Sequence, residues 1–137
     1  MKLMKILLAL VFAVVTAFAS TPGAQEEEHA GWMKTAQATA GKLRTNIGNK
    51  AAEDVAKDAA AMEEVFKKCE EFWKKRNTED AVKWSQQSQT SAKEIADAAK
   101  SGDMEKASTS LRSLMGNCSA CHTAHREKLA EGGYKIK

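Results

Sequence analysis

Apolar and small residues recur at steps of three and four along four successive segments of this chain. In the second segment this seam consists of Val55, Ala59, Met62, Phe66, Cys69 and Trp73. The first segment has the same pattern at His29, Met33, Ala36, Ala40, Leu43 and Ile47. A weaker seam (Ala81, Trp84, Ser88, Ala92, Ile95 and Ala99) and a looser one (Met104, Ala107, Leu111, Leu114, Cys118, Cys121, His125 and Leu129) follow. Such spacing predicts four amphipathic α-helices, each with one face turned toward a common core.

Polar residues and glycines mark where these helices begin and end. The acidic residues at 26–28 suit the start of the first helix, where the helix dipole favours negative charge. Thr78 and Asp103 are predicted N-caps of the third and fourth helices. Glycines follow the first, third and fourth helices, as they do at many helix C-termini. These signals predict helices over about residues 26–47, 51–76, 79–100 and 104–131.

The three predicted connections are short, and short connections make sequential helices antiparallel neighbours. Ala, Lys, Glu and Gln dominate the composition, and no run of β-branched residues suggests a strand. The predicted fold class is therefore all-α, an antiparallel up-down-up-down four-helix bundle. Residues 20–137 suffice for a single domain with one modest core.

Residues 1–19 have the pattern of a cleavable export signal. A short basic start precedes an apolar stretch over 6–19 that is too short for a comfortable membrane span. Ala17-Phe18-Ala19 fits the small-x-small cleavage pattern, so we expect cleavage after Ala19, with Ala24 as the second candidate. No cysteine lies near that junction, so we expect a mature protein without a membrane anchor.

The charge balance bears on the class of partner. The chain has 21 Lys and Arg residues against 18 Asp and Glu residues, and cleavage after Ala19 removes Lys2 and Lys5. The mature chain is then nearly neutral. Because it also lacks a basic stripe interleaved with aromatic residues, we expect no nucleic-acid partner.

The candidate chemistry lies near the C-terminus, in Cys118-Ser119-Ala120-Cys121-His122. These residues read Cys-x-x-Cys-His, the attachment pattern of c-type haem, in which each thiol forms a thioether and the adjacent imidazole reaches the iron. The alternatives are a disulfide and a zinc site that includes His125, although no fourth zinc ligand other than His122 is obvious. The sequence predicts one covalently bound haem c.

An exported four-helix chain with this motif on its last helix resembles the class II c-type cytochromes, which include the cytochromes c-prime and their low-spin, six-coordinate relatives. The resemblance is sharpest over residues 118–126, where Arg126 matches the family pattern and His125 replaces an aromatic residue. It implies that Cys118 and Cys121 hold the haem, that His122 is the proximal ligand and that Arg126 lies near the haem. It also implies a periplasmic location. Many relatives form homodimers through their first two helices.

Met33 is the expected sixth ligand of the iron. It lies about seven residues from the start of the first predicted helix, and His122 lies about eight residues from the end of the antiparallel fourth. At about 1.5 Å per residue, both are then roughly 10–12 Å from the same end of the bundle. Ala36 and Ala40 follow Met33 on its stripe and leave room for a flat cofactor. Six-coordinate relatives place a methionine ligand early in this helix.

Two alternatives concern the same face of the iron. Met33 can fill core space or shield the sixth position without bonding to the iron, as a side chain does in the cytochromes c-prime. His29 lies one turn earlier and is expected to be exposed at a frayed helix start, although a shifted helix would bring it to the iron.

Other residues are expected to surround this site. Cys69 is predicted to be a buried, inert thiol, with a redox or disulfide role as the alternative. Several aromatic side chains near it should form part of the core and of the haem pocket wall (Phe66, Phe72, Trp73 and Trp84). The basic residues at 67–68 and 74–76 are expected on solvated faces, with a docking patch for a redox partner as the alternative.

The predicted function is that of a non-enzymatic, periplasmic one-electron carrier that exchanges electrons with redox partner proteins. The alternative is a five-coordinate protein, similar to the cytochromes c-prime, that binds NO or CO. A third class is a helical interaction or metal-binding domain without haem. Catalysis is not expected, because no polar acid–base pair stands out around Met33.

Overall fold

A computed structural model describes residues 22–137 of the chain. The expected export signal at 1–19 lies outside the described residues.

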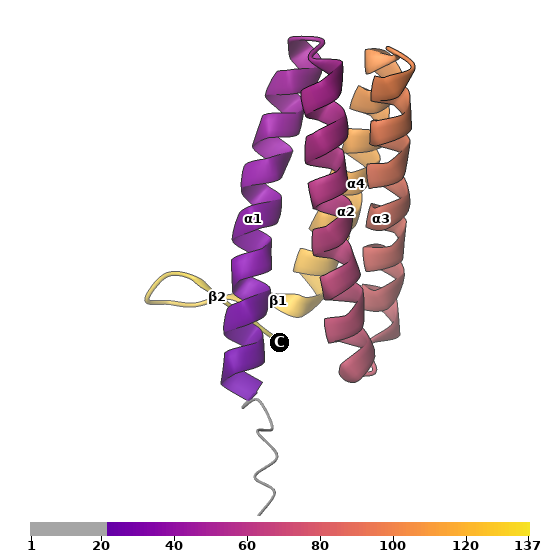
Figure 1. Cartoon of the computed structure of the whole chain (residues 1–137). Coiled ribbons are helices and arrows are strands. Elements are labelled where there is room, and N and C mark those ends of the chain that lie inside the picture. Colours follow the sequence, from indigo (N-terminus) through magenta and orange to yellow (C-terminus); the bar gives the residue numbers. More distant parts are fainter. Residues whose placement is uncertain (1–21) are drawn as a thin grey trace, which may run out of the picture.

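Four helices pack side by side along the chain: α1 (Pro22–Gly48), α2 (Ala52–Lys75), α3 (Glu79–Lys100) and α4 (Met104–His125). Figure 1 shows that consecutive helices are joined at alternate ends, so each helix runs opposite to the previous one. The predicted up-down-up-down four-helix bundle is confirmed. Within the described range, two three-residue strands follow, β1 (Arg126–Lys128) and β2 (Tyr134–Ile136).

The connections between helices are tight, as the sequence predicted. A residue with positive φ occurs in each of them: Lys50 (φ 56°), Asn77 (φ 53°) and Gly102 (φ 76°). Asp103 caps α4, because its Oδ1 accepts a hydrogen bond of 2.9 Å from the Lys106 backbone N–H. Thr78 occupies the predicted N-cap position of α3, but its hydroxyl donates to the Arg76 carbonyl and makes no cap bond.

The core is formed by the predicted helix faces. The whole seam of α2 is buried, including Cys69 and Trp73. Leu43, Met62, Ile95 and Leu114 are among the largest fully buried side chains, and each comes from a different helix. The four amphipathic faces therefore meet along one axis.

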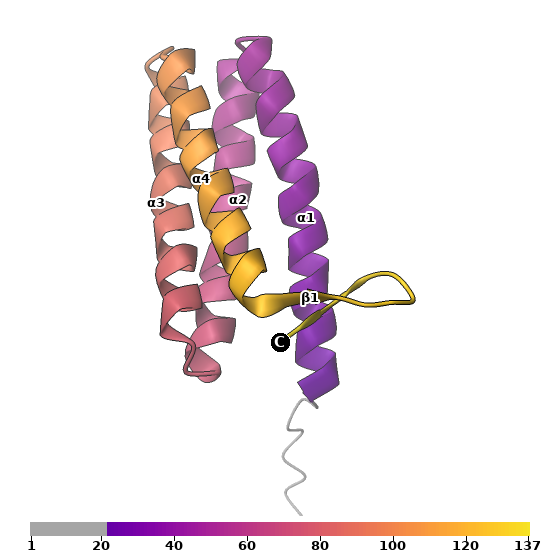
Figure 2. The same cartoon turned by 180° about the vertical axis from the view of Figure 1, so that it is seen from behind.

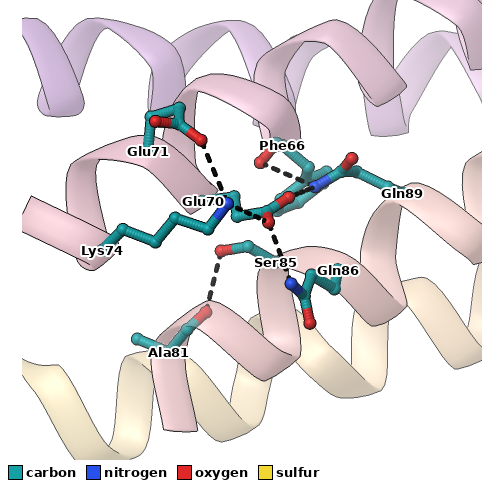
Figure 3. Close-up of polar contacts among 8 residues, drawn as sticks. All are labelled: Phe66, Glu70, Glu71, Lys74, Ala81, Ser85, Gln86 and Gln89. Carbon is teal, nitrogen blue, oxygen red and sulfur yellow. Dashed lines mark hydrogen bonds and ion pairs between the residues drawn. The ribbon is translucent and has the colours of Figure 1, made fainter. Parts of the chain in front are cut away.

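The packing is uneven around the bundle. The α2–α3 interface is the most extensive, whereas α1 and α4 touch only sparsely. At the α2–α3 interface, the Glu70 carboxylate accepts hydrogen bonds from Lys74, Gln86 and Gln89 at 2.6–2.9 Å (Figure 3). The bonds from Gln86 and Gln89 join α3 to α2, whereas the α1–α4 edge is held less firmly.

Two predicted boundaries are wrong. α1 begins at Pro22 rather than near residue 26, and its first turn contains no acidic residue. Proline is tolerated there because the first helical N–H groups have no partner within the helix. α4 ends at His125 rather than near residue 131, so Leu129 does not extend its apolar stripe.

A short hairpin replaces the last predicted turns of α4. β1 pairs antiparallel with β2, with Arg126 opposite Ile136 and Lys128 opposite Tyr134. The backbone N–H of Lys137 also donates to the carbonyl of His125. Figures 1 and 2 both show the hairpin leading from the end of α4 across the lower part of α1, and Ile136 packs against the core.

Candidate functional site

The Cys-x-x-Cys-His motif occupies the last two turns of α4. Cys118 and Cys121 are free, half-buried thiols that pack against the core. Their spacing of three places them on the same side of the helix. Burial raises the pKa of both thiols to about 11, so both are protonated at neutral pH.

The third cysteine, Cys69, lies on α2 and is buried, as predicted. Burial raises its pKa to about 12, with smaller contributions from the charges of Cys121 and Cys118. A thiol so strongly protonated is a poor nucleophile.

His122 follows directly and is also half-buried. Burial lowers its pKa, and the positive charge of Arg126 lowers it further. A neutral imidazole is the form that binds iron and other metal ions.

Arg126 is close enough to His122 for its charge to act there, but its side chain turns toward the hairpin. Its guanidinium carbon lies 3.8 Å from the centroid of the Tyr134 ring, and the residue is exposed in β1. The hairpin therefore determines where the Arg126 charge sits.

His125 is held between α2 and α3. Its Nε2 lies 2.9 Å from Asp80 Oδ1, and its ring centroid lies 5.1 Å from Trp73 and 6.1 Å from Trp84. His125 therefore lies in an aromatic pocket formed by α2 and α3. Within residues 22–137, no cluster of three or more His, Cys, Asp or Glu side chains is placed to hold a metal ion.

His29, on α1, was predicted to be exposed, but it is partly buried. Its ring stacks on Phe72, with centroids 4.5 Å apart, and meets Trp73 edge-on at 5.5 Å. Burial lowers the pKa of His29 to about 4, and the charges of Arg76 and His122 lower it further. The prediction failed because α1 begins before residue 26, which places His29 inside the helix, where it packs against aromatic residues of α2.

Met33 is half-buried and packs against the core one turn further along α1. His29 and His125 both contact Trp73, so the early part of α1 and the end of α4 lie at the same end of the bundle. Met33 lies four residues after His29 on α1, and His122 lies three residues before His125 on α4, so each is about one helical turn further from that end. Both helix ends used in the prediction were wrong.

Arg76 does not belong to a solvated face, in contrast to the prediction. Its Nη2 lies 3.3 Å from Glu26 Oε1, and its guanidinium carbon lies 4.4 Å from the centroid of Phe72. Its Nε is buried and has no hydrogen-bond partner in the described part of the chain. This half-buried cation lies at the same end of the bundle as His29 and His125.

The lysines beside it remain exposed, as predicted, and some are paired with acids on their own helix. Lys67 contacts Glu63 and Glu64, and Lys74 contacts Glu70 and Glu71. A surface hollow of about 400 Å³ between α1 and α2 is lined by lysines, glutamates, Trp32 and Phe72. The positive charge on this face is therefore largely balanced.

Sequence reasoning missed Asp80 and the hairpin as parts of this site. Asp80 follows an N-cap position and carries no local sign of a partner in α4. The pair Gly132-Gly133 before Tyr134 did carry a signal, because two glycines with positive φ are typical of a hairpin turn.

Comparisons with models of protein families, with curated proteins and with solved structures find no match. Among the described residues, no helix has the length and apolar character that crossing a membrane requires.

Proposed function

We propose that this protein is a periplasmic c-type cytochrome that carries one electron on a covalently bound haem. Cys118 and Cys121 hold the haem, His122 is the proximal ligand and Met33 is the sixth ligand. The observation that carries the proposal is that the motif presents two free thiols and a neutral imidazole on one half-buried face of α4, and that Met33, like both cysteines, packs against the core.

The residues around the motif fit a haem. The α1–α4 edge, which contains the motif and Met33, is the least tightly packed edge of the bundle. Aromatic side chains lie at the same end, and the buried Nε of Arg76 is a donor without a partner among the described residues. A cofactor with an apolar ring and acidic substituents complements such a site.

Met33 is preferred to His29 as the sixth ligand because the six-coordinate cytochromes that the chain resembles place a methionine ligand early in this helix. The His29 ring is also occupied by contacts with Phe72 and Trp73. A thioether opposite an imidazole favours a high reduction potential and suits electron transfer.

The haem supplies the one-electron chemistry, and the chain determines its surroundings. His122 is kept neutral by burial and by Arg126, so its lone pair is available at neutral pH. His125 and Asp80 hold the end of α4 against α3. Buried apolar residues exclude water from the interior and thereby favour the less charged, reduced state.

Optical spectra of the ferric and ferrous protein, with and without carbon monoxide, test this proposal. An electron carrier should show a low-spin, six-coordinate spectrum that resists carbon monoxide, and Met33→Ala should abolish both properties. Met104→Ala is the matched control, because Met104 is half-buried at the opposite end of α4. A high-spin spectrum with ready binding of carbon monoxide in the unmutated protein would instead indicate a gas-binding protein.

A further inference from the structure

Arg76 is a half-buried cation whose hydrogen-bonding capacity is only partly used within the described residues. It lies at the C-terminal end of α2, and its side chain is 28% exposed. Glu26 contacts only Nη2, at 3.3 Å, and Nε is buried without a partner. A buried donor without an acceptor is costly, so a ligand that brings an acceptor to Nε would be bound favourably.

The surroundings of Arg76 place it beside the proposed haem site. Its guanidinium lies over one ring, Phe72, against which His29 also stacks. Arg76 and His29 therefore share Phe72 as a neighbour, which places the guanidinium at the end of the bundle where His29 and His125 contact Trp73.

We propose that Arg76 binds a propionate carboxylate of the haem, an inference that rests on the proposed function. The propionates are the anionic groups of this cofactor, and a guanidinium offers several N–H donors in one plane that match a carboxylate. Glu26 contacts Nη2 and offsets part of this charge, while Nε remains without an acceptor among the described residues. The contact fixes the orientation of the haem, and its positive charge favours the reduced iron, so Arg76 is a positioning residue.

The reduction potential of the purified holoprotein tests this inference. Arg76→Gln should lower the midpoint potential, and Arg76→Lys should restore part of the loss because it keeps the charge without the planar donors. Lys75→Gln is the matched control, since it removes the same charge from an exposed neighbour. Its midpoint potential should remain at the wild-type value within the error of the titration.

Two results would overturn the inference. One is a potential for Arg76→Gln that equals that of the wild type, even if its melting temperature falls, which would make Arg76 a purely structural residue. The other is an equal fall of the midpoint potential in Arg76→Gln and Lys75→Gln, which would show that the potential depends only on the overall charge of the protein. Intact mass separates these results from failure of the proposed function, because thioether-bound haem stays attached in every variant.

Discussion

His125, the last residue of α4, lies 2.9 Å through its Nε2 from Oδ1 of Asp80, in the first turn of α3. The ring also contacts Trp73 on α2 and Trp84 on α3. Against the opposing effect of desolvation, the hydrogen bonds from His125 and Ala81 lower the pKa of Asp80. One side chain therefore links the C-terminal end of α4, just after the Cys-x-x-Cys-His motif, to two other helices.

His125→Ala should lower the free energy of unfolding by about 1–2 kcal/mol, because it removes two aromatic contacts and a hydrogen bond. His125→Phe keeps a ring between the indoles and should lose less. Urea denaturation followed by circular dichroism measures both. Equal stability of all three proteins would show that this contact contributes nothing to the fold.

Cys69 should be the single free thiol of the haem-bearing protein. Burial raises its pKa to about 12, so a thiol reagent should label it only after unfolding. Labelling in denaturant should yield one modified residue, and Cys69→Ser should yield none. Rapid labelling of the folded protein, or labelling of more than one residue, would contradict the prediction.

The ionisation of Glu70 should make the free energy of unfolding depend on pH in the acid range. Hydrogen bonds from Lys74, Gln86 and Gln89 lower its pKa to about 2 from the usual 4.5, while desolvation opposes the shift. Stability from the ionised Glu70 is therefore complete above pH 4.5 and is lost as the pH falls toward 2. At neutral pH, Glu70→Gln should cost about 1 kcal/mol, a figure that allows for solvent screening at this surface position.

The difference in melting temperature between Glu70→Gln and the wild type should shrink as the pH is lowered through this range. Glu71→Gln is the control, because the Glu71 side chain is 65% exposed and its one ion pair within residues 22–137 is with Lys74 (Figure 3). A difference in melting temperature that stays constant from neutral to acid pH would contradict the lowered pKa of Glu70.

Two glycines should respond to alanine in opposite ways. A Cβ at Gly116 on α4 meets no atom within 4 Å, so Gly116→Ala should stabilise the bundle by about 0.5–1 kcal/mol. Gly133 has a φ of 82°, so Gly133→Ala should strain the hairpin and speed hydrogen exchange at the Leu129 amide, which bonds to the Gly133 carbonyl. Thermal melts and amide exchange measure the two effects. If the Leu129 amide still exchanged slowly in Gly133→Ala, the strain predicted at the positive φ of Gly133 would be contradicted.

The elements that could be predicted are those fixed by nearby residues. The α2 seam follows from helical spacing alone, and Asp103 caps α4 through a residue only three positions away. The turn before α4 could also be predicted locally, because Gly102 supplies the positive φ that this turn requires. The spacing of Cys118, Cys121 and His122 likewise carries its chemistry within five residues.

The features that were missed depend on distant residues. Asp80 and His125 are 45 positions apart, and Glu26 and Arg76 are 50 apart. The end of α4 was misplaced because residues 126–129 are tolerated in helices and Leu129 continues the apolar spacing. Pairing with Tyr134–Ile136 decides their conformation instead, and local pattern does not reveal it.

The intact mass of the exported, processed protein tests the central claim most directly. The protein should be purified from a host that attaches haem to Cys-x-x-Cys-His motifs, and measured under denaturing conditions. We predict the mass of the mature polypeptide plus one haem, with Cys69 as the remaining free thiol. A mass equal to that of the bare processed polypeptide, with Cys118 and Cys121 both free, would contradict the account.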